Sequence, residues 1–315
     1  MTKERRKETK RFTLALAICY KERYDACTGC GKAFSDRDTQ HLGFDKSGNC
    51  MNVCDSCEPS LEEVACRYAY VPRLYTIPEP EDTLWRYMDF AKFVSLLKER
   101  ALYFPAAVLF KDPFEGAIGD KSREEEWDKV QLESFQKIAD KSSSDKKHYY
   151  PKTMIAAFKS FGEHTRKCTF INSWHLNEHE SEAMWSLYTK DQACSIAIKT
   201  TYDRLYNAIG KNPLIDIGKV NYIDYTETFV EIRAPFWFKR KSFQHENEVR
   251  AILTDYDKKE FNGLYVQADL NTLIQTVCIS PTCDSWLSEL IDNISQRYGV
   301  SVPITKSAIS SQPFY

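Results

Sequence analysis

From about residue 83 onward, apolar positions recur at two spacings, one typical of strands and the other typical of helices. Short apolar or alternating runs predict strands. They cover residues 84–88, 101–105, 168–174, 193–199, 217–223, 246–254, 264–270, 274–280 and 301–305. Helical spacing follows Asp89, a candidate N-cap, and recurs in four later segments. These are residues 121–148, a charged helix with a loop, and residues 180–190, 201–209 and 283–298.

Helices and strands mix along the chain without a regular strand–helix–strand rhythm. Such a pattern favours the α+β class over a doubly wound parallel sheet. We therefore expect an α+β fold with a mixed, mainly antiparallel sheet and flanking helices, preceded by a small zinc-binding module.

The chain divides into three stretches of different character. Residues 1–70 hold a basic N-terminal helix and a cysteine-rich segment, residues 71–83 form an acidic connector with several prolines, and residues 84–315 carry the α+β pattern. The apolar run 12–20 follows basic residues, as in a signal peptide, but it is too short to span a bilayer. We therefore expect an amphipathic helix there rather than a secretion signal, and no membrane partner.

Composition and charge narrow the functional classes only slightly. With 43% hydrophobic and 13% aromatic residues, the chain has the apolar content of a globular protein. Its net charge of -2 gives no overall attraction for nucleic acids, so such binding would need a local patch. The 11 cysteines are an odd number, and four of them form two CxxC pairs. This favours metal ligation in a reducing compartment over disulfides, so we expect a cytoplasmic protein.

The strongest motif is a pair of CxxC strings, Cys27 with Cys30 and Cys54 with Cys57, separated by 23 residues. Each string places two sulfurs at one tight turn, and two turns supply the tetrahedral four-thiolate shell that zinc favours in structural sites. We therefore expect a structural zinc ion, with ordinary reduced cysteines as the plainer alternative. The other cysteines of this region, as alternative ligands or buried thiols, are Cys19, Cys50 and Cys66.

The segment between the two CxxC strings resembles the treble-clef core of HNH nucleases. His41 would match the base of that family, Asn49 its asparagine, and Cys54 and Cys57 its knuckle. However, Gln40 stands where the family has an acidic metal ligand, and no later histidine completes a catalytic metal site. The resemblance thus implies a degenerate, structural clef, and it leaves open whether His41 or Cys50 takes part in metal binding.

Four strings stand out in the larger stretch: LWRYM at 84–88, FKDPFEG at 110–116, SEAMWSLYT at 181–189 and KSFQHENEVRAIL at 241–253. Each has a plain structural explanation, such as a salt-bridged strand, a core-packing helix or a capped turn. Their order and spacing, however, resemble a bacterial family known only as a domain of unknown function, often found beside phage-defence genes.

The same strings are distantly similar to ADP-ribosyltransferases. This resemblance implies a first strand that carries Arg86 beside the nicotinamide site and a middle strand that carries Ser173. It also implies a helix whose aromatic residue, Trp185 or Tyr188, packs on nicotinamide. A late strand would then carry the catalytic glutamate within the string HENEVR at 245–250.

The residues of that late strand suit the expected chemistry. Departure of nicotinamide leaves an oxocarbenium-like ribose, which a fixed carboxylate would stabilise, and we assign this role to Glu248. Strand alternation would place Glu246 on the same face, about 7 Å away, where it could orient or deprotonate an acceptor. Arg86 or Arg250 could bind the pyrophosphate of NAD through paired hydrogen bonds.

Three hypotheses about function follow. The first is an ADP-ribosyltransferase-like effector of defence or toxin type, which uses NAD to modify a nucleic acid or protein. The second is a non-catalytic binding module for nucleic acid or protein, because the aromatic and basic run 236–243 could stack bases and neutralise phosphates. The third is an HNH-like nuclease. The acceptor, the trigger and the oligomeric state stay open.

Overall fold

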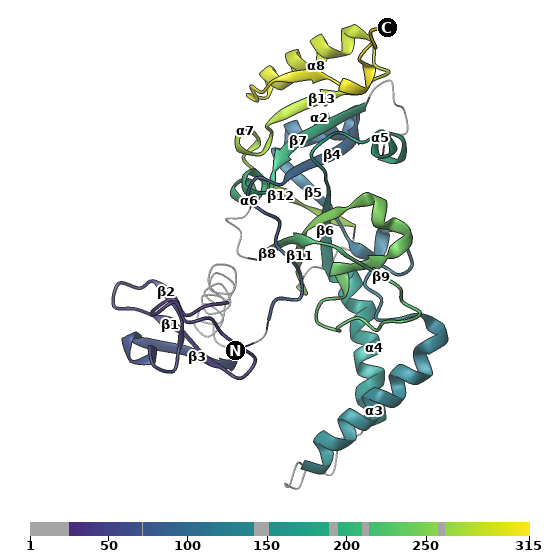
Figure 1. The fold of residues 1–315 in the computed structure, drawn as a ribbon. Helices are drawn as coiled ribbons and strands as arrows, with labels where there is room; N and C mark the ends of the chain where they lie inside the picture. The colour runs from purple at the N-terminus through teal and green to yellow at the C-terminus, as the bar shows by residue number, and fades with distance from the viewer. Residues whose placement is uncertain (1–24, 71, 142–150, 189–194, 210–213, 258–261) are drawn as a thin grey trace. The chain divides into compact units, whose positions relative to one another are not determined.

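The computed structural model describes residues 25–315 apart from 71, 142–150, 189–194, 210–213 and 258–261 (Figure 1). The predicted N-terminal helix and the loop that follows residue 141 lie outside these residues. The chain forms two compact units. One runs to Leu74 and includes a short segment that ends at Asp216; the other comprises Tyr75–Lys211 and Ile217–Tyr315. No helix in the described part of the chain combines the length and apolar character needed to cross a membrane.

The first unit is built on a three-stranded antiparallel sheet with the order β2-β1-β3. Its elements are β1 (Thr39–Phe44), β2 (Cys50–Cys54), the 3-10 turn η1 (Glu58–Ser60) and β3 (Glu63–Ala69). A single small cluster of Cys27, Phe34, Val53 and Cys54 forms its interior, with Leu42 also fully buried. So little apolar volume is typical of a module that needs a metal or another crosslink for stability.

The second unit contains a seven-stranded sheet with the order β14-β13-β7-β4-β6-β11-β8. In that order its strands are Ile304–Lys306, Thr276–Ile279, Ser195–Thr201, Thr83–Asp89, Thr169–Leu176, Glu248–Thr254 and Ile215–Lys219. The pairings from β13 through β7, β4 and β6 to β11 are antiparallel, whereas β13 and β14 are parallel. The expected α+β class with a mixed, mainly antiparallel sheet is thereby confirmed.

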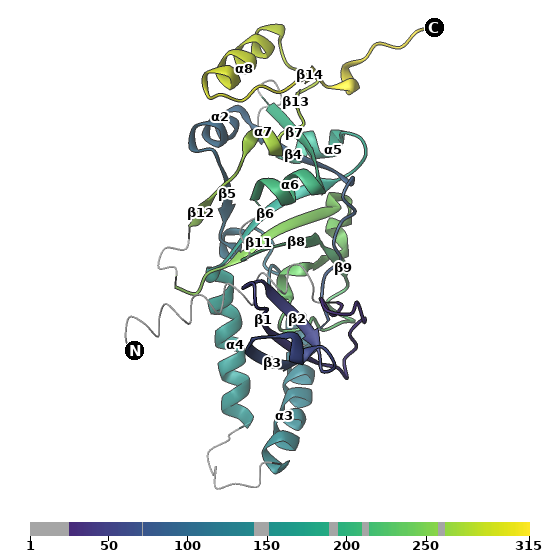
Figure 2. The same cartoon turned by 90° about the vertical axis from the view of Figure 1, so that its left-hand side faces the viewer.

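Two short two-stranded sheets and several helices complete this unit (Figures 1 and 2). The small sheets pair β5 (Ala101–Pro105) with β12 (Gly263–Gln267), and β9 (Asn221–Ile223) with β10 (Phe238–Arg240). The α-helices are α2 (Phe90–Glu99), α3 (Glu124–Lys141), α4 (Pro151–Cys168), α5 (Glu182–Tyr188), α6 (Tyr202–Ile209), α7 (Leu270–Leu273) and α8 (Ser285–Arg297). The 3-10 turns are η2 (Ala107–Leu109), η3 (Lys121–Arg123), η5 (Pro235–Trp237), η6 (Lys241–Glu246) and η7 (Ala308–Ser310).

The local sequence explains how β4 passes into α2. The carboxylate of Asp89 accepts a hydrogen bond from the backbone N–H of Lys92, as the N-cap assignment predicts. The helix then buries Phe93, Leu96 and Leu97, which lie on one side at helical spacing. It ends at Arg100, whose φ of 48° is left-handed. The apolar pattern of this segment is therefore sufficient to place the helix.

The pairing between β4 and β6 is unusually short. These two strands share only two residue pairs, Leu84 with Leu176 and Trp85 with His175. By contrast, β4 pairs with β7, and β11 with β6, over seven residue pairs each. After the pair of Trp85 with His175 the ladder between the two strands ends, so the rest of β6 has no paired residues in β4. We call this place the β4/β6 seam.

Two features of the second unit differ from expectation. Helix α4 has no counterpart in the predicted elements, although Ile155 and its apolar neighbours at helical spacing pack against Trp127 and Phe135 of α3. Glu246 lies in η6 rather than in the strand, which begins at Glu248. The break comes from Asn247, whose φ of 37° is left-handed, a conformation that asparagine tolerates better than most residues.

Candidate active site and metal centre

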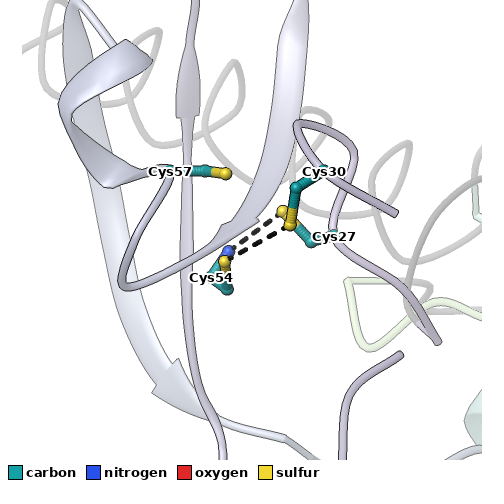
Figure 3. Close-up of side chains that lie close together, drawn as sticks. All are labelled: Cys27, Cys30, Cys54 and Cys57. Carbon is teal, nitrogen blue, oxygen red and sulfur yellow. Dashed lines mark hydrogen bonds between the residues drawn. The ribbon is translucent and has the colours of Figure 1, made fainter. Parts of the chain in front are cut away.

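The four cysteines of the two CxxC strings converge in the first unit (Figure 3). Their sulfur atoms all lie within 4.8 Å of one another, and those of Cys30 and Cys54 are 3.8 Å apart. Zn–S bonds of about 2.3 Å in a tetrahedron would separate two sulfurs by about 3.8 Å. The donor set and its spacing therefore fit a four-coordinate metal ion of the zinc type.

Two tight turns bring the sulfurs together. In the first, the N–H of Gly31 bonds the carbonyl of Cys27, and Gly31 has a φ of 74°. In the second, the N–H of Cys57 bonds the carbonyl of Cys54. Gly29 belongs to the first turn and faces the second, so that a Cβ added to it would lie 3.1 Å from the Cys57 side chain. Glycine at this position therefore allows the two turns to approach.

The four sulfurs affect one another's protonation. Burial opposes ionisation of Cys27, but backbone N–H groups, led by that of Cys54 at 3.3 Å, outweigh it and lower its pKa to about 6. The pKa of Cys57 is instead raised to about 12, first by its hydrogen bond with the sulfur of Cys30, then by burial and the neighbouring sulfurs. Four thiolates so close together repel one another unless a cation lies between them.

His41 supports the second turn from outside the sulfur cluster. Its Nε2 donates to Asp55 over 2.6 Å, and its Nδ1 accepts from Nε of Arg67 over 3.1 Å, so both ring nitrogens have protein partners. The buried Gln40 accepts hydrogen bonds from Asn52 and Tyr68. This arrangement suits a structural histidine, and it leaves the nuclease hypothesis without a free base at His41.

The remaining residues considered for metal binding lie elsewhere. Cys50 begins β2 and does not belong to the four-sulfur group, and Asn49 binds Asp45 in the β1–β2 turn. Cys19 and the side chain of Cys66 are outside the described part of the chain. Among the described residues, the four sulfurs are the one group with the geometry of a metal site.

In the second unit, five charged side chains form a buried row around Glu248. The order is Glu115, Arg250, Glu248, Lys239 and Glu246, so that acidic and basic groups alternate. All five are at most 8% exposed. With every group ionised, the row holds one more carboxylate than cations. Burying so many charges is costly unless each is paired, and here each is.

Glu248 is the central member of this row and the first residue of β11. Arg250 donates from Nε to its Oε1 over 2.9 Å and from Nη2 to its Oε2 over 3.0 Å. Lys239 approaches from the other side, with Nζ 3.4 Å from Oε2. Burial alone would raise the pKa of Glu248, but the charges of Arg250 and Lys239 outweigh it and lower the pKa to about 2.

Arg250 has no hydrogen-bond donor left for a ligand. Two of its five N–H groups bond Glu248, as above, and two bond Glu115 over 2.5 and 2.9 Å. The fifth bonds the carbonyl of Phe236 over 2.6 Å. Because a guanidinium has five N–H donors, this side chain is fully engaged. Of the two arginines considered for pyrophosphate binding, Arg250 is therefore a support for Glu248.

Arg86 occupies the β4/β6 seam. It leaves β4 on the face opposite to Trp85, and its Nη1 donates to the backbone carbonyl of Ser173 over 2.7 Å. This is its one hydrogen bond, and it has no ion pair within the described residues. Burial lowers the pKa of Arg86 to about 10. A partly buried cation with donors to spare favours an anionic ligand.

The strand register brings Ser173 and His175 onto the same face as Glu248 and Arg250. Ser173 pairs with Arg250, and His175 pairs with Glu248. The buried Ser173 hydroxyl lies close to the Glu248 carboxylate, whose pKa it helps to lower, and it has no partner at full hydrogen-bond geometry among the described residues. The Nδ1 of His175 donates to the carbonyl of Glu246 over 2.6 Å, and burial lowers the His175 pKa.

The two aromatic candidates of α5 differ in accessibility. Trp185 is 1% exposed and packs against Tyr87 in the core, so its ring offers no open face. Tyr188 is 44% exposed. Burial of its hydroxyl end, followed by the charges of Glu246 and Glu248, raises the pKa of Tyr188. Tyr188 thus lies beside the carboxylates with part of its ring open, whereas Trp185 does not.

Three residues near the carboxylates were not singled out from the sequence as site residues. The hydroxyl of Tyr222 accepts the backbone N–H of Glu248 over 2.8 Å, Lys239 links Glu246 to Glu248, and Glu115 holds Arg250. Only the string FKDPFEG gave a signal for Glu115, whose carboxylate bonds Arg250.

The aromatic and basic run 236–243 is buried in its first part. Phe236 and Trp237 are buried, Lys239 joins the buried row, and Arg240 pairs with Asp112 over 2.7 Å. Lys241 and Ser242 are exposed. The run therefore offers a smaller surface for stacking and phosphate binding than the binding-module hypothesis assumes.

Comparisons with known proteins give limited information. No protein-family model and no curated protein sequence matches the chain. Solved structures of DarT from Thermus sp. 2.9 do match. Its complex with NAD+ has a TM-score of 0.36 and 7% identity, over 75% of this chain and all of that one. Its complex with ADP-ribosylated ssDNA has a TM-score of 0.34 and 10% identity, over 74% and 96%. TM-scores and sequence identities this low carry no functional assignment for this chain.

Proposed function

We propose that this chain is an ADP-ribosyltransferase-like enzyme that uses NAD, with Glu248 as its catalytic carboxylate. The observation that carries the proposal is the state of this side chain, which is buried, fixed by Arg250 and Lys239, and ionised at neutral pH because its pKa is about 2. Departure of nicotinamide leaves positive charge on the ribose, and a carboxylate already fixed beside it stabilises that charge without reorganisation.

The neighbouring residues supply the other parts of an NAD site. Arg86 would bind the pyrophosphate, since its guanidinium has spare donors and no ion pair in the described structure. Its side chain leaves β4 on the face opposite to Glu248, so NAD would reach it through the β4/β6 seam. Tyr188 would offer its partly exposed ring to nicotinamide, and the hydroxyl of Ser173, which lies close to Glu248, would bond the substrate.

Glu246 would act on the acceptor. It lies next to Glu248 through their shared partner Lys239, so it is close enough to orient an incoming nucleophile. Accepting a proton would require Glu246 to exchange its bond with Lys239 for one with the nucleophile. The acceptor would be a nucleic acid or a protein. The enzyme would act as an effector of defence or toxin type in the cytoplasm.

The four cysteines would hold a structural zinc ion in the first unit. All four ligand positions would be filled by sulfur, which leaves none open for a substrate or water. When bound, the ion would supply crosslinking to a unit whose apolar interior is small.

The test of the proposal is incubation of the purified protein with NAD labelled in its adenine part. Wild type is compared with Glu248→Gln and with Glu289→Gln, a control that changes an exposed glutamate of α8. Cell extract and single-stranded DNA are supplied separately as acceptors, the latter because the matched DarT structure contains ADP-ribosylated ssDNA. We expect nicotinamide release by wild type and control, and a loss of about 100-fold or more in Glu248→Gln.

Label transfer to one of the acceptors would identify its class. Release of nicotinamide without any transfer would make the protein an NAD hydrolase. If no protein of the set releases nicotinamide while all remain folded, the transferase proposal is wrong.

A further inference from the structure

The turn that contains the string DPFEG places the carboxylate of Glu115 in the interior of the second unit. The N–H of Glu115 bonds the carbonyl of Asp112, and Gly116 follows with a φ of 76°. A Cβ on Gly116 would lie 2.5 Å from the ring of Phe236, so only glycine lets the turn come this close. The Glu115 carboxylate is 1% exposed and meets Arg250 through two parallel hydrogen bonds.

The turn does not need Glu115 to stay in place. Asp112 pairs independently with Arg240, and the ring of Phe114 packs against Tyr225 with centroids 5.0 Å apart. Burial raises the pKa of Glu115, which reflects the cost of enclosing a carboxylate that an uncharged side chain of similar size would avoid. A buried charge at a position that is already anchored indicates a role beyond holding the turn.

That role follows from the donors of Arg250. Glu115 takes two of the five, in the plane of the guanidinium, and so fixes both the position and the rotation of the group. On the other edge of the guanidinium, Nε and Nη2 donate one hydrogen bond each to the two carboxylate oxygens of Glu248. Without Glu115, the guanidinium would keep its charge, its two bonds to Glu248 and its bond to the Phe236 carbonyl. It would lose two of the five bonds that fix its rotation, so that it could shift and displace Glu248.

We propose that Glu115 is a positioning residue for catalysis, which acts through Arg250 to fix the Glu248 carboxylate. The inference rests on the proposed function of Glu248. Because a displacement of about 1 Å in a catalytic group can change the rate about 100-fold, the fixed geometry matters more than the presence of the charge. Glu115 itself touches no reacting atom.

The test is a double-mutant cycle on nicotinamide release, with Glu115→Gln, Glu248→Gln and the double variant. We expect Glu115→Gln alone to lower kcat about 10- to 100-fold with KM for NAD changed less than about threefold. In the Glu248→Gln background the same change should have no further effect on the residual rate. Glu289→Gln, which changes an exposed glutamate of α8, is the control and should keep its kcat.

Three results would overturn the inference. These are an equal loss from Glu115→Gln in both backgrounds, an effect on KM alone, or an equal loss in Glu289→Gln. If Glu115→Gln does not fold, Glu115→Asp replaces it, since the shorter side chain keeps the charge but withdraws it from Arg250. A kcat equal to that of wild type in this variant would also contradict the positioning role.

A second readout separates this inference from the proposed function. If wild type releases no nicotinamide, the function proposed for Glu248 fails, and the coupling is then measured by thermal unfolding of the same variants. Non-additive shifts in Tm would show that Glu115 and Glu248 act through Arg250, whereas additive shifts would overturn the positioning role.

Discussion

The buried row makes the stability of the second unit depend on pH through Glu248. The perturbation is Glu248→Gln, which keeps the shape of the side chain but cannot ionise. In the folded chain the pKa of Glu248 is about 2, against an ordinary value of 4.5. At about 1.4 kcal/mol for each pKa unit, ionised Glu248 contributes about 3 kcal/mol to the free energy of unfolding at neutral pH.

The sign of this contribution follows from the direction of the shift. A carboxyl whose pKa is lower in the folded state stabilises that state above its unfolded pKa, here about pH 4.5. The contribution decreases as the pH falls and is lost near pH 2. The difference in unfolding free energy between wild type and Glu248→Gln should therefore be about 2 kcal/mol smaller at pH 3 than at pH 6.

Denaturant unfolding followed by tryptophan fluorescence measures this difference. All six tryptophans lie after Tyr75, so the signal reports on the second unit alone. Glu289→Gln, which changes an exposed glutamate, should follow wild type at every pH. A difference between wild type and Glu248→Gln that stays constant from pH 6 to pH 3 would refute the reasoning that Arg250 and Lys239 hold this carboxyl ionised in the folded chain.

Other changes test other parts of the structure. Gly116→Ala should lower the free energy of unfolding by about 1–3 kcal/mol, because it combines a left-handed backbone with a clash against Phe236, and an unchanged midpoint in urea would contradict this. Asp89→Ala removes the N-cap of α2 and should cost about 1 kcal/mol in the same assay. Metal analysis should find one zinc per chain in wild type and in Cys50→Ser but none in Cys54→Ser, and equal zinc in both variants would contradict the four-sulfur site.

The sequence was most informative where a residue's neighbours along the chain determine its structure. The strand from Thr83 to Asp89 and the helix after it follow from local spacing and from one cap, and both were predicted. The two CxxC strings carry their own turn geometry, so the convergence of Cys27, Cys30, Cys54 and Cys57 could also be expected.

Tertiary pairing was much harder to predict. Nothing near Glu115 in the sequence indicates that Arg250, more than 130 positions later, is its partner. The spacing of Trp185 and Tyr188 predicts a helix but not which ring becomes core. The left-handed Asn247, which removes Glu246 from the strand, was missed because a single residue in this conformation leaves the alternating pattern of the sequence intact.

The β4/β6 seam has a mechanical consequence. The seven strands form two blocks, one from β14 to β4 and the other from β6 to β8. The blocks are joined by two residue pairs, by Arg86, and by hydrogen bonds of Asn177 with Thr83 and Trp85. Few hydrogen bonds need to break for the blocks to change their relative twist, so deformation of the sheet should concentrate there. Amide hydrogen exchange would then be faster in β6 at the seam than in β7, and an anion that engages Arg86 would slow it.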